Sequence, residues 1–381
     1  MSDITPITMP KWGLTMTEGK VLGWLRREGD SYRAGEELLE IETTKITNVF
    51  EASEPGTLRR IVAASGVTLP IGALLAVSAP PGVPDSDVDA FIAGFATPEP
   101  ASEAAATEAG EATPREIEAG GRRLRVLDIG SGDGAPIVLV HGFGADLNAW
   151  MFNQPVLAAG LLTIGRRVVA LDLPGHGGSV KQVGAGSAEG FASTVSDVLA
   201  ALGIERFHLI GHSMGGAIAL VLAGQMPTRI ASLTLLAPAG LGPEINSAFI
   251  DGFVRVQRRR EAQELLAVLV HNPSLISRAM VEETLRYKRL DGVPAALDTI
   301  ARAWFTGDRQ LLDLRPALAA LTMPVQIIWG RDDRIIPVAH AEALSGNKMQ
   351  VHILDAVGHI PQMEKAGDVN RLIARFVEAN P

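Results

Sequence analysis

The stretch Gly211-His212-Ser213-Met214-Gly215-Gly216 constrains the fold of this chain more than any other feature. It follows one apolar run, 206–210, and opens another, 217–223, which indicates a strand, a tight turn and a helix. Glycines on both sides of Ser213 suit a bend too sharp for side chains, and they leave the serine hydroxyl exposed above a sheet. The free N–H groups at the start of the helix would point at whatever the serine attacks. The same pattern also occurs in ordinary tight turns, so other residues must decide between the two interpretations.

The chain from residue 116 onward alternates strand-like and helix-like segments, which predicts an α/β domain with a mostly parallel sheet. The segment 240–316 interrupts this alternation because it is helical and rich in Arg, Leu and Ala, and we expect it to form a cap inserted between two strands. The expected strands are 122–129, 137–140, 167–171, 207–210, 233–236, 325–329 and 351–354, and the expected helices include 191–202, 214–225 and 368–378.

Polar motifs follow four of the predicted strands, at the edge where ligands bind in open α/β sheets. A serine hydroxyl is a weak nucleophile until an imidazole takes its proton, and that imidazole needs a carboxylate to fix its tautomer. The motifs are His141-Gly142-Phe143-Gly144, Asp172-Leu173-Pro174-Gly175-His176-Gly177, Gly330-Arg331-Asp332-Asp333 and Gly358-His359-Ile360-Pro361. The order serine, aspartate, histidine is that of the α/β-hydrolase fold, and residues 116–381 resemble that family.

The resemblance implies a catalytic triad. Ser213 would be the nucleophile, His359 the general base and Asp333 the orienting acid, with Asp332 as the second candidate for that acid. His359 is singled out among the eight histidines by its place in Gly-His after the last predicted strand.

The same resemblance implies that the backbone N–H groups of Phe143 and Met214 form an oxyanion hole. Three other histidines lie in or beside these motifs. We expect His141 and His176 to shape their turns, and His212 to pack next to the nucleophile while lining the site.

Residues 1–79 have the pattern of a small all-β domain, with short apolar runs between turn signals such as Glu28-Gly29-Asp30 and Pro55-Gly56. Glu42-Thr43-Thr44-Lys45-Ile46 lies in the middle of this segment. With Met9-Pro10 near its start and glycines at matching offsets, the segment resembles the lipoyl domain of 2-oxo acid dehydrogenase complexes. That family usually has Asp-Lys-Ala where this chain has Thr44-Lys45-Ile46.

The resemblance implies that lipoate is attached to Lys45, at the tip of a hairpin. Biotinyl domains have Met on both sides of the lysine, so Thr44 and Ile46 favour lipoate over biotin. The alternative is a solvated lysine in a turn.

Residues 80–115 are rich in Pro, Ala, Glu and Thr, a composition typical of a linker. Within it, Val88, Phe91, Ile92 and Phe95 have helical spacing, and a short helix near 86–96 is expected, capped by Ser86 with Asp89. Its apolar face could pack on its own chain or on a partner subunit. No small helical subunit-binding domain is recognisable in this segment, so how partner subunits dock stays open.

A lipoyl domain fused to an α/β-hydrolase domain resembles the acyltransferase component of the acetoin dehydrogenase complex. This implies transfer of an acetyl group from the arm on Lys45 to coenzyme A. It also implies two partners, a thiamine-diphosphate-dependent dehydrogenase component and dihydrolipoamide dehydrogenase. Two rival hypotheses remain: a hydrolase (thioesterase, esterase or carbon–carbon bond hydrolase) with a lipoyl carrier, and a carrier or scaffold with a non-catalytic hydrolase-like domain.

The cap offers a candidate site for the phosphates of coenzyme A. Arg255, Arg258 and Arg259 are expected on one helical face, with Arg260 beside them. Arginine geometry suits phosphate, and the cap is less acidic than the rest of the chain. The alternative interpretation is a solvated helix surface.

Composition excludes several other classes of function. The 381 residues carry a net charge of −9, which argues against a nucleic-acid binder. No apolar run approaches the roughly 18 residues of a membrane span. Because cysteine is absent, disulfides, thiolate metal sites and a cysteine nucleophile are excluded, and no metal site is expected. These features predict a cytoplasmic enzyme.

Overall fold

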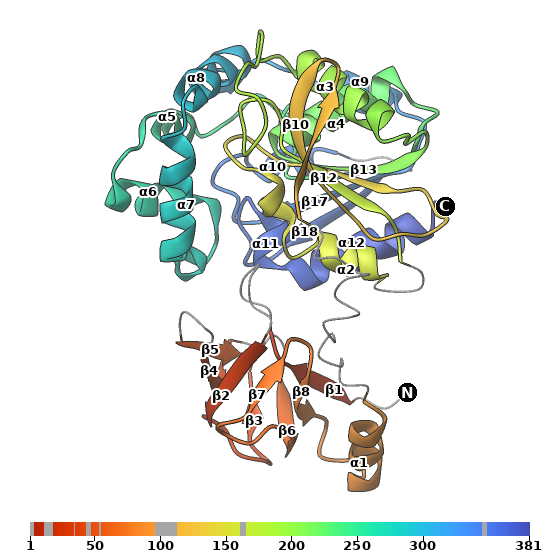
Figure 1. The fold of residues 1–381 in the computed structure, drawn as a ribbon, viewed down its shortest axis with the longest axis vertical. Helices are drawn as coiled ribbons and strands as arrows, with labels where there is room; N and C mark the ends of the chain where they lie inside the picture. The colour runs from red at the N-terminus through yellow and green to blue at the C-terminus, as the bar shows by residue number, and fades with distance from the viewer. Residues whose placement is uncertain are drawn as a thin grey trace. The chain divides into compact units, whose positions relative to one another are not determined.

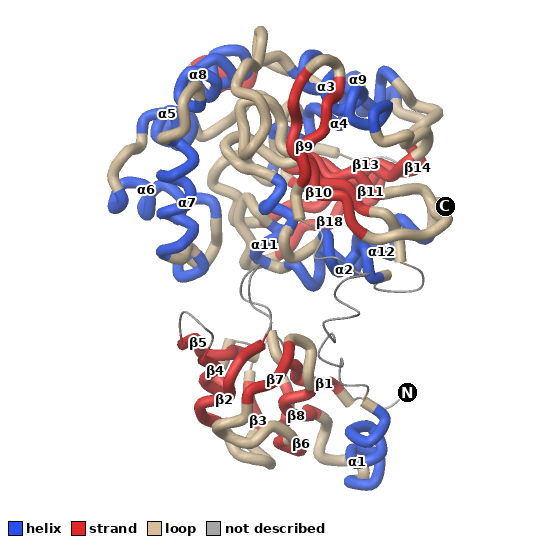
Figure 2. The backbone as a smooth tube through the Cα atoms, in the orientation of Figure 1, coloured by secondary structure: helices blue, strands red, loops and turns tan. Residues whose placement is uncertain are grey.

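The computed structural model of the chain describes residues 4–10, 18–33, 35–42, 47–52, 55–95, 113–160, 165–344 and 349–381. Its contacts divide the chain into two compact units, Met1–Glu111 and Ala112–Pro381. The first unit is built mainly from strands, and the second is a sheet covered by helices (Figures 1 and 2). Each unit has a hydrophobic core of its own.

The first unit contains two four-stranded antiparallel sheets, which confirms the prediction of a small all-β domain. Apolar side chains from both sheets meet in one core, where Val21, Leu39 and Leu58 are fully buried. Gly56 is required at its position, because a Cβ there would lie 2.3 Å from the hydroxyl of Ser78. One sheet has the order β1 (Thr5–Thr8), β8 (Leu74–Ser78), β6 (Gly56–Ile61), β3 (Ser31–Tyr32), and the other β5 (Thr47–Glu51), β4 (Glu37–Glu42), β2 (Glu18–Trp24), β7 (Thr68–Pro70).

A short helix, α1 (Asp85–Gly94), also belongs to the first unit and packs on its own chain. Val88 is fully buried against strand β8. The first turn has no side-chain cap, so the predicted capping by Ser86 with Asp89 is wrong. Asp89 instead forms an ion pair with Arg60 of β6 at 3.0 Å, which holds the helix against the sheet.

The second unit is organised by an eight-stranded sheet whose central strands are parallel, as an α/β-hydrolase domain requires. Only the edge formed by β9, β10 and β12 is antiparallel. The order is β18 (Met349–Leu354), β17 (Val325–Gly330), β14 (Ile230–Leu236), β13 (Phe207–His212), β11 (Ile137–Val140), β12 (Val168–Leu171), β10 (Arg122–Ile129), β9 (Arg115–Ala119). The predicted fold class is confirmed.

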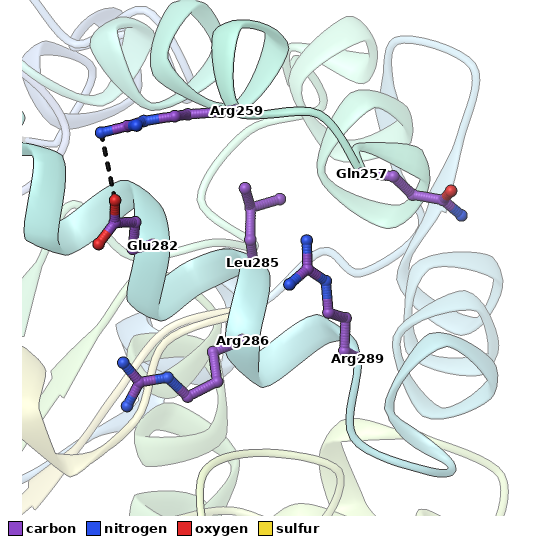
Figure 3. Close-up of a pocket in the computed structure, with 6 residues that line it drawn as sticks. All are labelled: Gln257, Arg259, Glu282, Leu285, Arg286 and Arg289. Carbon is purple, nitrogen blue, oxygen red and sulfur yellow. Dashed lines mark ion pairs between the residues drawn. The ribbon is translucent and has the colours of Figure 1, made fainter.

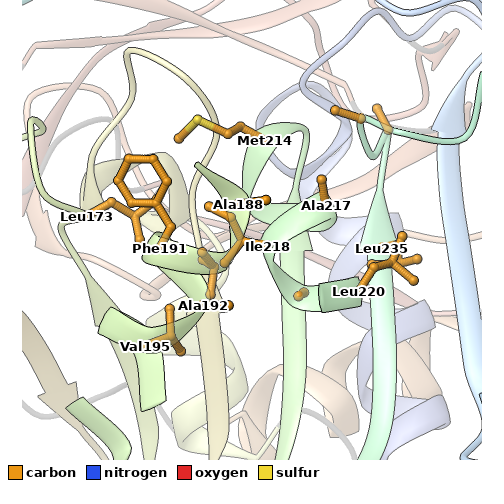
Figure 4. Packing of buried hydrophobic residues seen from close by; sticks show 14 of the residues in the cluster. Leu173, Ala188, Phe191, Ala192, Val195, Met214, Ala217, Ile218, Leu220 and Leu235 are labelled. Atoms are coloured by element: carbon orange, nitrogen blue, oxygen red, sulfur yellow. The ribbon is translucent and has the colours of Figure 1, made fainter. Parts of the chain in front are cut away.

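Helices cover both faces of this sheet, which explains the uninterrupted apolar sequence of strand β11. Its Val138 and Val140 face the core beneath α3 (Ala188–Ala201) and α4 (Met214–Gln225). Ile137 and Leu139 face the opposite core, beneath α2 (Gln154–Ala159) and α12 (Ala366–Glu378). Successive side chains of a strand point to opposite faces, so a strand buried on both sides has no polar positions. Figure 4 shows apolar side chains of α3 and α4, such as Phe191 and Ile218, packed together.

The cap consists of four helices that lie together at one side of the sheet (Figure 1). They are α5 (Ser247–Arg255), α6 (Arg259–Leu266), α7 (Arg278–Lys288) and α8 (Val293–Trp304). Short 3-10 turns, η2 (Ala267–Leu269) and η3 (Pro273–Leu275), connect α6 to α7. The next helix, α9 (Arg315–Ala320), packs on α4 and so forms part of the main body. Among the residues that the structure describes, no helix combines the length and apolar character needed to cross a membrane.

Candidate active site

Ser213 occupies a strained position between strand β13 and helix α4. Its φ of 54° and ψ of −117° lie outside the regions that non-glycine residues normally adopt. The bend is fixed by backbone hydrogen bonds, in which Ser213 N–H donates to Leu236 O (2.9 Å) and Ser213 O accepts from Ala239 N–H (3.0 Å). These hydrogen bonds therefore hold the strained residue, with its hydroxyl at the carboxyl edge of the sheet.

The glycines around Ser213 are required because the backbone passes too close for side chains. A Cβ at Gly211 would lie 2.3 Å from Gly215 O, and one at Gly215 would lie 2.3 Å from Val140 O. A Cβ at Gly216 would lie 2.7 Å from the side chain of Pro238. Each contact involves rigid neighbours that cannot move aside cheaply.

Replacing Gly215 with alanine should destabilise the fold and reduce activity, because the new methyl group would clash with two backbone carbonyls of the β11 edge. We expect a loss of roughly 2–4 kcal/mol in the free energy of unfolding, measured by urea denaturation. Gly224→Ala is the matched control, since Gly224 lies on the same helix with no atom within 4 Å of its Cβ position. That change should raise stability by roughly 0.5–1 kcal/mol. Equal effects at both positions would contradict the steric argument.

A chain of hydrogen bonds connects Ser213, His359 and Asp333. His359 Nε2 lies 3.0 Å from Ser213 Oγ, and His359 Nδ1 lies 2.8 Å from Asp333 Oδ2. The side chains of His359 and Asp333 are almost completely buried, which protects these contacts from water. Because the carboxylate can only accept, Nδ1 carries the proton and Nε2 faces the serine as an acceptor.

Asp333 is held rigidly by the loop after β17. Its Oδ1 accepts the N–H groups of Ile335 (2.8 Å) and Ile336 (3.0 Å), and its Oδ2 also accepts from Trp329 Nε1 (2.9 Å). Asp332 makes no comparable contact with His359, because its carboxylate lies 2.8 Å from the ring of His271 in the cap. The geometry therefore favours Asp333 over Asp332.

The loop after β11 lies directly against the serine. A Cβ at Gly142 would lie 3.1 Å from Ser213 Cβ, which is tighter than an ordinary contact, so a glycine suits this close approach. The N–H groups of Phe143 and Met214 make no hydrogen bond with any residue that the structure describes. Both are therefore free donors close to the hydroxyl, as an oxyanion hole needs.

His141 and His176 support this loop rather than facing Ser213. His141 Nε2 accepts from Leu173 N–H (3.1 Å), and its Nδ1 donates to Gly142 O (2.8 Å). His176 Nε2 accepts from Gly144 N–H at 3.1 Å. Both rings are buried, and burial lowers the pKa of each imidazole below its ordinary value. The two neutral rings therefore fix the loop that carries Phe143.

His212 supports the catalytic histidine from the other side. Its Nε2 donates to His359 O at 2.8 Å, and its Nδ1 has no hydrogen-bond partner among the described residues. Burial lowers the pKa of His212 to about 3, so this ring is neutral near pH 7. Its role is to hold the backbone of His359.

Two contacts that the sequence does not reveal hold the loop of His359, one from the cap and one from helix α11 (Pro361–Glu364). Leu269 O accepts the N–H of His359 at 2.7 Å. The carboxylate of Glu364 accepts the N–H groups of Gly358 (2.8 Å) and His271 (2.7 Å), and so bridges the histidine loop and the cap. Burial raises the pKa of Glu364. No motif links Leu269 to His359 or His271 to Glu364, because these contacts join distant parts of the chain.

Arg334 adds a further contact between the cap and the loop after β17. Its guanidinium group donates to Val270 O at 2.8 Å and also to Ala267 O. Together with Leu269, these carbonyls place the segment 267–271 against both loops of the candidate site.

Arg255, Arg258 and Arg259 do not share a helical face, so that prediction is wrong. Helix α5 ends at Arg255, and α6 begins only at Arg259. The helix stops because Val256 turns into the core, and Lys288 donates to the carbonyls of Phe253 and Val256.

Two of these arginines are already paired with carboxylates. Arg258 lies 3.6 Å from Glu261, and Arg259 lies 3.2 Å from Glu282 of α7. Arg255 is exposed at the end of α5.

Lys45 lies outside the described residues. The flanking strands β4 and β5 pair as far as Glu42 and Thr47, and residues 43–46 connect them. A lysine in the connection between two paired strands fits the attachment of a long prosthetic arm.

Two family models match the chain. The model described as alpha/beta hydrolase fold matches residues 135–366, and the one described as biotin-requiring enzyme matches residues 5–77. Among solved structures, the meta-cleavage product hydrolase of Pseudomonas fluorescens has a TM-score of 0.61 at 23% identity, over 70% of this chain and 98% of its own. At that identity the likeness shows the fold alone.

Two curated relatives match the chain over nearly its whole length. One, from Pseudomonas putida, is named dihydrolipoyllysine-residue acetyltransferase component of acetoin cleaving system; it is 46% identical, over 99% of this chain and 99% of its own. A protein of the same name from Cupriavidus necator is 42% identical, over 98% of this chain and 97% of its own. The chain therefore belongs to this family of acetyltransferase components, and in it a lipoyl domain precedes an α/β-hydrolase domain.

Proposed function

We propose that this enzyme passes an acetyl group from a lipoyl arm on Lys45 to coenzyme A, with Ser213, His359 and Asp333 as its catalytic residues. The observation that carries the proposal is the hydrogen-bonded chain from Asp333 through His359 to Ser213, in a polypeptide that also contains a lipoyl domain. A domain that served only as a scaffold would not need a strained serine facing an oriented imidazole. When attached, lipoate would supply the acetyl group as a thioester.

The residues of the site can perform the transfer in two balanced steps. Ser213 Oγ attacks the thioester carbonyl while His359 takes its proton and then gives it to the departing thiol. His359 next takes the proton of the coenzyme A thiol, whose sulfur attacks the acetyl group on Ser213, and returns that proton to the serine oxygen. Asp333 keeps the imidazole in the required tautomer throughout. The N–H groups of Phe143 and Met214 would stabilise the oxyanion that forms in each step.

A direct attack by the thiol is the alternative route to the same products. In that route Ser213 donates a hydrogen bond to the oxyanion and is never acylated. The size of the loss caused by Ser213→Ala distinguishes the two routes.

The acceptor of the acetyl group separates transferase from hydrolase. With free acetyl-dihydrolipoamide as donor, coenzyme A should be acetylated much faster than acetate is released. The thiol and water compete for the same acyl group, and in a transferase the thiol is the favoured acceptor. Thiol and acetate release are measured together, with and without coenzyme A. Acetate release that depends on Ser213 but ignores added coenzyme A would instead make the protein a thioesterase.

The relatives are named as components of a multienzyme system, and the same setting fits this chain. Under the proposal, a thiamine-diphosphate-dependent dehydrogenase component loads the arm on Lys45, and dihydrolipoamide dehydrogenase reoxidises it. The arm passes through a dithiol form in every cycle, and a reducing compartment such as the cytoplasm suits that form.

A further inference from the structure

A pocket of about 330 Å³ lies in the cap, between the start of α6 and the helix α7. Its size is within the range of small-molecule sites. Figure 3 shows the Arg289 side chain extending from the end of α7 back toward Leu285. The lining residues are Gln257, Arg259, Glu282, Leu285, Arg286 and Arg289.

The pocket carries more positive than negative charge. Three guanidinium groups line it against the single carboxylate of Glu282, which is paired with Arg259 at 3.2 Å. Arg286 lies 3.3 Å from Glu283, outside the lining. Arg289 makes no ion pair or side-chain hydrogen bond with any residue in the described part of the chain. Its donors are therefore available to an anionic ligand.

The mixture of groups suits a nucleotide with phosphates. Guanidinium groups bind phosphate through paired hydrogen bonds, and a second arginine beside the first strengthens that preference. Leu285, which is mostly buried, offers an apolar surface to a base, and the amide of Gln257 can donate to or accept from the edge of a ring.

The pocket is connected to the catalytic residues by one continuous helical segment. Helix α6 starts at Arg259 and runs into η2, whose last residue, Leu269, accepts the N–H of His359. At the rise of an α-helix this segment is roughly 15 Å long. The two ends of this segment, one at the pocket and one at the His359 loop, are therefore separated by a distance that an extended pantetheine chain can span.

We propose that this pocket binds the nucleotide end of coenzyme A, with Arg286 and Arg289 contacting its phosphates. The inference rests on the proposed function and makes it specific. Arg255 and Arg258 do not line the pocket, so the predicted anion site moves to the end of α7, at Arg286 and the residue that follows the helix, Arg289.

The test compares two acceptors in the full-length protein. Pantetheine has the same thiol as coenzyme A but no nucleotide. In the double variant Arg286→Ala, Arg289→Ala, we expect KM for coenzyme A to rise about tenfold or more, because charge-assisted hydrogen bonds to phosphate are lost. KM for pantetheine and both kcat values should stay within about twofold. Arg260→Ala is the matched control, since Arg260 adjoins Arg259 but lies outside the pocket.

Three outcomes would overturn the proposal. An unchanged KM for coenzyme A would make the pocket a solvated surface, and an equal rise for both acceptors would mean general damage to the cap. If the two arginine changes raised only the KM for the lipoyl domain as acetyl donor, the pocket would be a docking surface for that domain. Calorimetric titration of coenzyme A into Ser213→Ala protein, with and without the two arginine changes, needs no turnover. It therefore tests the pocket even if acetyl transfer to coenzyme A is refuted.

Discussion

Replacing Ser213 with alanine should lower acetyl transfer to coenzyme A by about 10³-fold or more if the serine is the nucleophile. His359 would then have no hydroxyl to deprotonate, although the oxyanion donors and the binding surfaces would remain. The rate is measured with saturating acetyl-dihydrolipoamide and coenzyme A, so that kcat is compared. A loss of only about 10²-fold would indicate that Ser213 merely stabilises the oxyanion.

Two controls make this prediction specific. Ser274→Ala changes an exposed serine on the cap and should leave kcat unchanged. Thermal unfolding should show that Ser213→Ala protein is folded, because alanine is no larger than serine. Transfer that continues at the wild-type rate in Ser213→Ala would place the chemistry elsewhere.

Replacing Lys45 with alanine should abolish transfer through the assembled system but spare the hydrolase domain. Without the arm no acyl group reaches the active site by an intramolecular route, whose effective concentrations are on the order of millimolar. The variant should still acetylate coenzyme A from free acetyl-dihydrolipoamide. Intact-mass analysis of protein from a lipoate-replete host should show one lipoyl group on the wild type and none on the variant.

Lys20→Ala is the control for this experiment. Lys20 lies on β2, and its ammonium group is 3.9 Å from Glu42 on the neighbouring strand, so the change perturbs the same sheet without removing the attachment point. It should keep the lipoyl mass and the activity of the assembled system. A biotin mass, or a lipoyl group that persists in Lys45→Ala, would refute the assignment.

Two elements whose bounds were predicted correctly, strand β11 and helix α4, are buried on nearly all sides. Strand β11 has a continuous apolar run because both of its faces are covered, and the bounds predicted for it agree with the structure. Helix α4 was also predicted correctly, because the glycines around its start and its apolar sequence mark a buried helix. The candidate site followed from the strand pattern, since three of the motifs begin at the end of a buried strand and Gly358-His359 follows the partly buried strand β18 after a turn.

Strand β9 was missed because its sequence, Arg115–Ala119, is mostly charged. It is an edge strand with one neighbour, β10, so most of its side chains can face water. The pair Gly120-Gly121, in which both residues have positive φ, makes the tight turn between the two strands. That turn signal was present in the sequence, and it was the only available indication of the hairpin.

The break between α5 and α6 could not be predicted by periodicity. The spacing of Arg255, Arg258 and Arg259 is compatible with one helix, and no proline or glycine separates them. Helix α5 ends where Lys288, far along the chain, donates hydrogen bonds to the carbonyl groups of Phe253 and Val256. A tertiary contact of this kind leaves no local pattern.

The contacts of segment 267–271 restrict how this enzyme can be re-engineered. A simple redesign would treat the cap as an exchangeable module and leave the catalytic residues in the body. Here the peptide carbonyl of Leu269 and the carboxylate of Glu364 anchor the backbone of the His359 loop. A chimera that receives a foreign cap would lose the first of these anchors and leave an unpaired N–H at its general base. Transplantation should therefore keep residues 267–271 with the recipient body and exchange only the helices outside them.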